Sequence, residues 1–172
     1  MDFEIRLLEE SDSLEELIAL LHRAYKRLAD MGLQFVATHQ GDDTTLDRIR
    51  GRGCYVIQRE GKIIGTACFA PPDLAEGCDW YEQAGVAKLS QFAVEPELQG
   101  LGIGSRMMEF VENRAREVGA RELALDTSEH AHHLIDFYGK RGYRFVQHAQ
   151  WPDVNYRSVV MSKSLDNGTL DE

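Results

Sequence analysis

The chain has 172 residues, of which 43% are hydrophobic and 28% are charged. This length and balance are typical of one globular domain with a substantial core and exclude an intrinsically disordered chain. A formal net charge of −10 disfavours a nucleic-acid-binding surface, because phosphate contacts need clustered lysine and arginine side chains.

The cysteines and the N-terminal sequence bear on where the protein works. Cys54, Cys68 and Cys78 contain no CxxC pair and are typical of reduced thiols. The N-terminal stretch MDFEIRLLEE lacks the apolar segment of a signal peptide, and no apolar run approaches the roughly 18 residues that span a bilayer. We therefore expect a cytoplasmic protein without a membrane partner.

The N-terminal segment is expected to contain one strand and two helices. Residues 3–10 alternate between apolar and polar side chains, which predicts the strand. Asp12 or Ser13 then caps a helix whose apolar residues recur at i, i+3 and i+4, and Gly32 ends it. A short second helix is expected over residues 42–51.

The rest of the chain is expected to alternate strands with two more helices. The clearest pattern is a hairpin over residues 54–70, in which two β-rich runs meet at Glu60-Gly61-Lys62. The remaining expected elements are strands over residues 87–95, 121–128, 143–149 and 155–165, a helix from Ile103 to Gly119, and a helix over residues 129–142. The order β-α-α-β-β-β-α-β-α-β-β and the hairpins predict one α/β or α+β sheet rather than a doubly wound parallel one.

Three glycines at alternate positions, Gly100, Gly102 and Gly104, stand between an expected strand and an expected helix. The first N–H groups of a helix have no partner inside the helix, and glycine lets an oxygen approach the backbone closely. A strand, a glycine-rich turn and a helix N-terminus therefore predict an anion site, for which a pyrophosphate is a suitable ligand.

The glycine pattern alone leaves several interpretations open. Ser105-Arg106 stands where the Walker pattern needs Lys-Ser/Thr, which argues against nucleotide hydrolysis. The dinucleotide fingerprint G-x-G-x-x-G is missed only at Ser105, and Asp126 lies about twenty residues further on, so a nucleotide-dependent redox domain is one alternative. Against it, the EPELQ connection is too long for the tight turn of that fold. An ordinary flexible turn is another alternative.

Two linked motifs narrow the choice. Gln99-Gly100-Leu101-Gly102-Ile103-Gly104 matches the signature [Gln/Arg]-x-x-Gly-x-[Gly/Ala], and Phe137-Tyr138-Gly139-Lys140-Arg141-Gly142-Tyr143 matches the signature aromatic-Tyr-x-x-x-Gly-[Phe/Tyr]. At this separation, the pair resembles the acetyl-CoA signature and the second signature of the GCN5-related N-acetyltransferase (GNAT) superfamily. The order of elements over about residues 1–165 also fits that superfamily.

The resemblance implies a GNAT-like fold of class α/β, with an α+β mixed sheet. Its centre would be a mostly antiparallel, twisted sheet of about six to seven strands with helices on both faces. Residues 1–165 would form this single acetyltransferase domain, and residues 166–172 would form a polar tail.

The resemblance also implies acetyl-CoA as a co-substrate. Its pantetheine arm would pair like an extra strand with Phe92, Ala93 and Val94, and a backbone N–H near Val94 would hold the thioester carbonyl. Its pyrophosphate would lie on the backbone of Gln99, Gly100, Leu101, Gly102, Ile103, Gly104 and Ser105.

Tyr138 is the expected catalytic acid. A leaving thiolate benefits from a proton donor, and a tyrosine with an ordinary pKa near 10 is protonated at pH 7. The other interpretation is a core aromatic, because Leu134 and Tyr138 share a helical face at i, i+4 spacing.

The general base is left open by the sequence. Some members of the superfamily carry glutamate six residues before the position of Val94, where this chain has Lys88. Deprotonation through water is one alternative. The other candidates are Asp79, Glu82, Asp126, Glu129 and the histidines His130, His132 and His133.

The histidine segment is the other departure from the family pattern. The three histidines lack the i, i+4 His pair of zinc-binding helices, so no metal is expected. The family often has asparagine near position 131, where this chain has Ala131, so that contact with the cofactor is absent or comes from Ser128 or His132.

The expected function is acetyl-CoA-dependent transfer of an acetyl group to a primary amine of a small molecule or of a peptide or protein. The acceptor is expected between residues 25–38, the loop 78–85 and residues 151–158, and the protein is expected to be a monomer or homodimer. Aromatic residues of these segments would line the acceptor site or pack in the core: Trp80, Tyr81, Trp151 and Tyr156. Acidic residues of the longer loop 71–85 would favour a cationic acceptor or simply be solvated: Asp73, Glu76, Asp79 and Glu82. A non-catalytic CoA-binding module or sensor of the same fold is the alternative.

Overall fold

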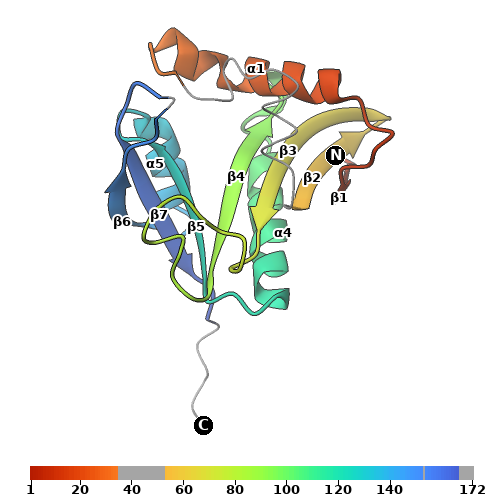
Figure 1. The fold of residues 1–172 in the computed structure, drawn as a ribbon. Coiled ribbons are helices and arrows are strands. Elements are labelled where there is room, and N and C mark those ends of the chain that lie inside the picture. Colours follow the sequence, from red (N-terminus) through yellow and green to blue (C-terminus); the bar gives the residue numbers. More distant parts are fainter. Residues whose placement is uncertain (35–52, 153, 167–172) are drawn as a thin grey trace.

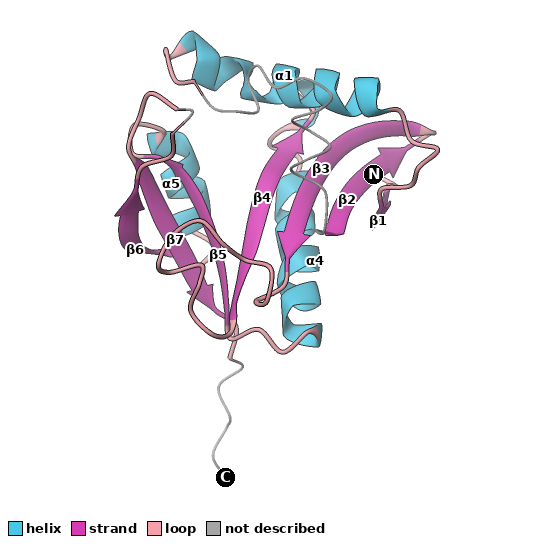
Figure 2. Cartoon of the chain, viewed as in Figure 1, coloured by secondary structure: helices cyan, strands magenta, loops and turns pink. Residues whose placement is uncertain are grey.

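The computed structural model describes residues 1–34, 53–152 and 154–166. In these residues, seven strands form one sheet in the order β1-β2-β3-β4-β5-β7-β6 (Figure 1). The strands are Glu4–Leu7 (β1), Gly53–Arg59 (β2), Lys62–Ala70 (β3), Val86–Val94 (β4), Glu122–Ser128 (β5), Arg144–Ala149 (β6) and Ser158–Ser164 (β7). The α-helices are Leu14–Asp30 (α1), Ile103–Glu117 (α4) and His132–Gly139 (α5), and Figure 2 distinguishes them from the strands and loops.

The sheet is mixed but mostly antiparallel, as the sequence predicts. β4 and β5 pair in parallel, and the other neighbouring strands pair antiparallel. The α5 helix starts three residues later than predicted, because Ser128 first forms a turn in which its hydroxyl oxygen accepts the backbone N–H of His130 at 3.1 Å. The helix predicted over residues 42–51 lies outside the described residues. No helix in the described ranges has the length and apolar character needed to cross a membrane.

The helices cover opposite faces of the sheet. Successive side chains of a strand point to opposite faces, and in β2 the buried Val56 packs with Leu20 of α1. Its neighbours Tyr55 and Ile57 instead belong to the main core together with Met107 of α4. The α1 helix therefore lies on one face and α4 on the other. In Figure 1, α4 and α5 lie behind the sheet.

The two halves of the sheet separate between β4 and β5. Only three residue pairs join these strands, from Val86 opposite Glu122 to Lys88 opposite Ala124. Figure 1 shows β4 and β5 meeting at their lower ends and diverging toward their carboxyl ends. Within β4, Gln91 adopts a left-handed φ of 50° at an irregularity in the register with β3, as in a β-bulge.

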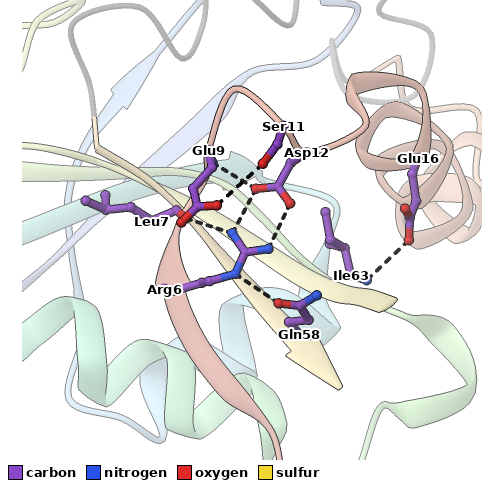
Figure 3. A network of polar contacts seen from close by, with 8 residues as sticks. All are labelled: Arg6, Leu7, Glu9, Ser11, Asp12, Glu16, Gln58 and Ile63. Atoms are coloured by element: carbon purple, nitrogen blue, oxygen red, sulfur yellow. Dashed lines mark hydrogen bonds and ion pairs between the residues drawn. The ribbon is translucent and has the colours of Figure 1, made fainter. Parts of the chain in front are cut away.

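The start of α1 is tied to the strands that it covers. The Ser13 hydroxyl oxygen accepts the Glu16 backbone N–H at 3.2 Å, so Ser13 is the helix cap. Asp12 instead forms two hydrogen bonds of 2.8 Å with the guanidinium of Arg6, which also donates to Gln58 of β2 (Figure 3). This network joins β1, β2 and the entry to α1.

The Arg6–Asp12 pair makes the stability of the fold depend on pH. The hydrogen bonds from Arg6 lower the pKa of Asp12, so its stabilising contribution is present above the unfolded-state pKa and is lost as the pH falls through the folded-state pKa. Asp12→Asn should therefore lower the melting temperature at pH 7, and the deficit should shrink below about pH 4. Asp30→Asn, in an exposed pair with Lys26, is the control and should have little effect. An equal deficit at pH 7 and pH 3 in thermal melts would contradict this role for Asp12.

Candidate active site

A cavity of about 570 Å³ lies where β4 and β5 diverge. It is lined from three directions: by α1, by β4 with the glycine-rich loop that follows it, and by α5. The lining residues are Ala24, Tyr25, Arg27, Leu28, Phe92, Ala93, Val94, Gln99, Gly100, Gly102, Gly104, Ser105, His133, Leu134, Phe137, Tyr138 and Arg141. The cavity thus brings together both sequence motifs, which are far apart in the chain.

The glycine-rich loop provides an open backbone surface at the start of α4. Gly100 and Gly102 have left-handed φ values of 81° and 83°, which side chains with a Cβ rarely adopt, and Gly102 is the N-cap residue of α4. A Cβ on either glycine would have no protein atom within 4 Å. This open space lies next to the unpaired N–H groups of the first turn of α4 and fits a phosphate group.

The seven predicted loop residues do not all face the cavity. Gln99, Gly100, Gly102, Gly104 and Ser105 line it. The Leu101 side chain is instead 59% exposed, and the Ile103 side chain is 2% exposed and packs in the core. For these two residues, only the backbone N–H groups can serve an anion.

The end of β4 also faces the cavity, through Phe92, Ala93 and Val94. Two backbone carbonyl groups at this end of β4 already accept hydrogen bonds from side chains of the protein. The Tyr25 hydroxyl donates to the Phe92 oxygen at 3.0 Å, and the Gln99 amide donates to the Val94 oxygen at 3.2 Å. These bonds hold the strand end against α1 on one side and against the glycine-rich loop on the other.

Tyr138 belongs to the core and to the cavity lining at once. Its side chain is 7% exposed, and its ring packs edge-on against Phe137 and Tyr143. Burial is the main cause that raises the pKa of the Tyr138 hydroxyl, and the nearby Tyr25 and Asp126 raise it further. The hydroxyl is therefore protonated throughout the neutral pH range and can act only as a proton donor there.

Arg141 is a cavity residue to which the sequence analysis gave no role. Its guanidinium lies 3.5 Å from the centroid of the Phe137 ring, donates to the Phe137 carbonyl at 2.7 Å and donates to the Ser105 hydroxyl. It thereby places a positive charge beside the glycine-rich loop. The sequence feature that could have identified Arg141 is its position four residues after Phe137, within the second motif.

Neither the candidate base Asp126 of β5 nor Lys88 of β4, which stands where some family members carry glutamate, lines the cavity. Each carboxylate oxygen of Asp126 accepts one hydrogen bond, from the Tyr81 hydroxyl at 2.5 Å and from the Trp151 indole N–H at 2.8 Å. The Lys88 ammonium lies 4.5 Å from the centroid of the Tyr81 ring. Tyr81 thus ties the loop before β4 to β5, Trp151 ties the loop after β6 to β5, and neither residue lines the cavity.

The other acidic candidates also lie apart from the cavity. Arg157 donates two hydrogen bonds to Glu129, and this contact lowers the pKa of Glu129. Asp79 and Glu82 are exposed on the loop before β4. Of the three histidines, His133 lines the cavity, and its pKa is lowered chiefly by burial. Among the residues whose placement is described, no group of three or more metal-ligating side chains was found.

Two of the three segments expected around the acceptor meet, namely the residues after α1 and residues 151–158. The Asn155 side chain accepts the Gln34 N–H and donates to the Gly32 carbonyl, both at 2.8 Å, so the loop before β7 is bound to the end of α1. Tyr156 is 7% exposed and packs there with Leu28. Tyr156 is therefore a packing residue rather than part of the cavity wall.

A glycine-rich turn at a helix N-terminus and a buried tyrosine in one cavity are what the two motifs imply for a CoA-dependent acetyltransferase, and comparisons with known proteins support this class. Residues 14–143 match the model of the Acetyltransferase (GNAT) family. The S-(2-succino)cysteine N-acetyltransferase of Bacillus subtilis is 32% identical over 143 residues, covering 80% of this chain and 82% of the relative. The S-alkylcysteine N-acetyltransferase of the same organism is 27% identical, covering 77% and 74%.

Solved structures share the fold. The ribosomal-protein-S18-alanine N-acetyltransferase of Escherichia coli matches with a TM-score of 0.72 at 16% identity, covering 99% of both chains. The PaiA N-acetyltransferase of Thermoplasma acidophilum, solved with coenzyme A, matches with a TM-score of 0.72 at 19% identity, covering 95% of this chain and 99% of the other.

The chain belongs to the Acetyltransferase (GNAT) family. It is an N-acetyltransferase that uses acetyl-CoA as co-substrate, as the two motifs predicted. The dinucleotide interpretation of the glycine loop is thereby wrong, and the enzyme is favoured over the binding module.

The cradle can be tested by adding a side chain to it. Gly102→Val should abolish CoA binding, because a branched side chain would fill the open space beside the first turn of α4. Gly119→Val is the matched control, since Gly119 has a similar φ of 79°, also has open space around its Cβ position and follows the far end of α4. Both variants should melt at lower temperature, but only Gly102→Val should lose CoA binding in isothermal titration calorimetry. Normal CoA affinity in Gly102→Val would refute the cradle.

Proposed function

We propose that this acetyltransferase acts on the α-amine of a free amino acid, and in particular on a cysteine with a substituted sulfur. The observation that carries this acceptor class is the similarity to two acetyltransferases whose names specify S-(2-succino)cysteine and S-alkylcysteine as acceptors. More distant relatives are amino-acid acetyltransferases, of which the chain covers only 23% in the first case. A cavity of about 570 Å³ is a suitable size for a small acceptor beside the end of the cofactor.

In this proposal, the cofactor lies along the back wall of the cavity. Backbone N–H groups between Gln99 and Ser105 hold the pyrophosphate, and Arg141 adds a positive charge beside them. Phe92, Ala93 and Val94 line the path of the pantetheine arm, and a backbone N–H near Val94 receives the thioester carbonyl. Residues 1–165 form the single catalytic domain, and residues 166–172 form a tail.

The co-substrate supplies an acetyl group as a thioester. The amine nitrogen forms a bond to the acetyl carbon, the carbon–sulfur bond breaks, the nitrogen loses a proton and the sulfur gains one. We assign the proton donor for the sulfur to Tyr138, because it lines the cavity and its raised pKa keeps the hydroxyl protonated.

The proton of the amine leaves through water in this account. Among the described residues that line the cavity there is no aspartate or glutamate. Lys88 stands where some family members carry glutamate, and it does not line the cavity either.

The predicted cytoplasmic location and the monomeric or homodimeric state remain predictions from the sequence.

An assay of CoA thiol release, with wild type and one tyrosine variant, tests both the activity and the acid. Wild type should release thiol from acetyl-CoA with S-methyl-L-cysteine as acceptor. Tyr138→Phe should lower kcat by about 10²-fold or more with little change in the Kd for CoA, because it removes the proton donor without removing the ring.

Tyr143→Phe is the matched control for this experiment. The Tyr143 hydroxyl is buried next to Tyr138 but donates to Glu112 at 3.0 Å rather than facing the cavity. Its loss should leave kcat within a few-fold of wild type. An unchanged kcat in Tyr138→Phe, with the chemical step rate-limiting, would remove Tyr138 from the mechanism. No thiol release by wild type with any amino acid, despite CoA binding, would contradict the proposed acceptor class.

A further inference from the structure

The cavity joins the two faces of the sheet. Ala93 packs with Leu17 and Leu21 of α1, and the next residue, Val94, packs in the core that contains α4. The part of the cavity lined by α1 therefore lies on the face opposite the α4 cradle. In the proposed function, a cofactor held at the cradle enters the gap between β4 and β5 from the α4 face, which leaves the α1 side for the acceptor.

The charges of the cavity lining differ in sign from those of the whole protein. The chain carries a formal net charge of −10. In the part of the chain that the structure describes, the cavity is lined by two arginines, Arg27 and Arg141, and by no carboxylate. Arg141 contacts Ser105 at the cradle, whereas Arg27 belongs to α1 at the opposite side. Each side of the cavity thus has its own guanidinium.

Arg27 is available for a ligand. Its side chain is exposed and makes no hydrogen bond or ion pair with another side chain of residues 1–34, 53–152 and 154–166. It acts on the neighbouring His133 of α5, whose pKa is lowered first by burial and then by the Arg27 charge. The described lining at this side of the cavity thus holds a guanidinium and no carboxylate, which favours an anionic group.

We propose that Arg27 binds the α-carboxylate of the acceptor amino acid. This inference rests on the proposed function, because it assigns a recognition residue to the amino-acid acceptor. A planar guanidinium can form two parallel hydrogen bonds with a carboxylate and so fixes its orientation as well as its position. An amino acid held in this way directs its α-amine away from Arg27 into the cavity, toward the residues that line the cofactor path.

Arg27 therefore determines specificity for amino acids over plain amines. The carboxylate is attached to the carbon that carries the amine, so an acceptor without it loses both the binding energy and the orientation. The enzyme should prefer S-methyl-L-cysteine to 2-(methylthio)ethylamine, which is the same molecule without the carboxylate. A hydrogen bond to a charged group is typically worth about a tenfold or larger change in affinity.

The test compares these two acceptors in wild type and in Arg27→Gln, with steady-state kinetics at saturating acetyl-CoA. Arg27→Gln should raise the KM for S-methyl-L-cysteine about tenfold or more. It should leave the KM for 2-(methylthio)ethylamine and the Kd for CoA within about twofold of the wild-type values. Arg27→Lys should recover part of the loss, because lysine keeps the charge but not the paired hydrogen bonds.

Lys26→Gln is the matched control. Lys26 precedes Arg27 on α1, is paired with Asp30 at 2.8 Å and does not line the cavity. Lys26→Gln removes the same unit of positive charge as Arg27→Gln. The comparison therefore separates recognition by Arg27 from the effect of a change in net charge. The KM values of Lys26→Gln for both acceptors should match those of wild type.

Four outcomes would overturn the assignment of Arg27. An unchanged KM for the amino acid in Arg27→Gln would remove Arg27 from acceptor recognition. An equal rise in the KM for both acceptors would show that Arg27 supports the packing of the site rather than binding the carboxylate. Weaker binding of CoA, seen as a higher Kd, would place Arg27 in the part of the cavity that holds the cofactor. Wild type that acetylates 2-(methylthio)ethylamine as well as the amino acid would refute carboxylate recognition and leave the acetyltransferase activity intact. Wild type that acetylates neither would contradict the proposed acceptor class itself.

Discussion

The short parallel pairing between β4 and β5 is the constraint on which the rest of the site depends. Three residue pairs join the strands, and beyond Lys88 and Ala124 they diverge. A sheet that continued its pairing would fill the space now occupied by the cavity with backbone hydrogen bonds. Because the strands separate, the end of β4 faces a cavity rather than the next strand, and this is the place proposed for the pantetheine arm.

The elements around the gap between β4 and β5 hold the gap open, and different helices line it on the two faces of the sheet. The α1 helix is bound to the strand end through Tyr25 and to the loop before β7 through Asn155. The α4 and α5 helices lie on the other face and contribute the cradle and Tyr138. In the proposed function, the two substrates approach the cavity from opposite faces, with Arg27 on one side and Arg141 on the other.

Much of the fold could be predicted from the sequence, because its elements have local signals. The spacing of apolar residues in α1, the turn at Glu60-Gly61 and the glycines before α4 depend on neighbours in the chain. The mixed, mostly antiparallel sheet and the GNAT family are confirmed. The late start of α5 was missed because the turn at Ser128 depends on a side-chain hydrogen bond that helical periodicity does not detect.

The details of the site were harder to predict, because they depend on contacts between distant residues. Arg141 meets Ser105 across 36 positions of sequence, and Tyr25 meets Phe92 across 67. The sequence likewise left Tyr81 open between the acceptor site and the core, whereas in the fold its hydroxyl donates to Asp126 and holds the loop before β4. Composition shows that such side chains exist, whereas only the fold shows which of them share a cavity.

A conjugate of the two substrates tests the account most directly. In this compound, the sulfur of CoA is joined through a –CH2–C(=O)– linker to the α-nitrogen of S-methyl-L-cysteine. If the split holds both substrates at once, the conjugate should bind about 10²-fold or more tightly than CoA, since one molecule makes both sets of contacts. It should also compete with acetyl-CoA and with the amino acid alike. A conjugate that binds no more tightly than CoA, or that competes with acetyl-CoA alone, would contradict a shared cavity.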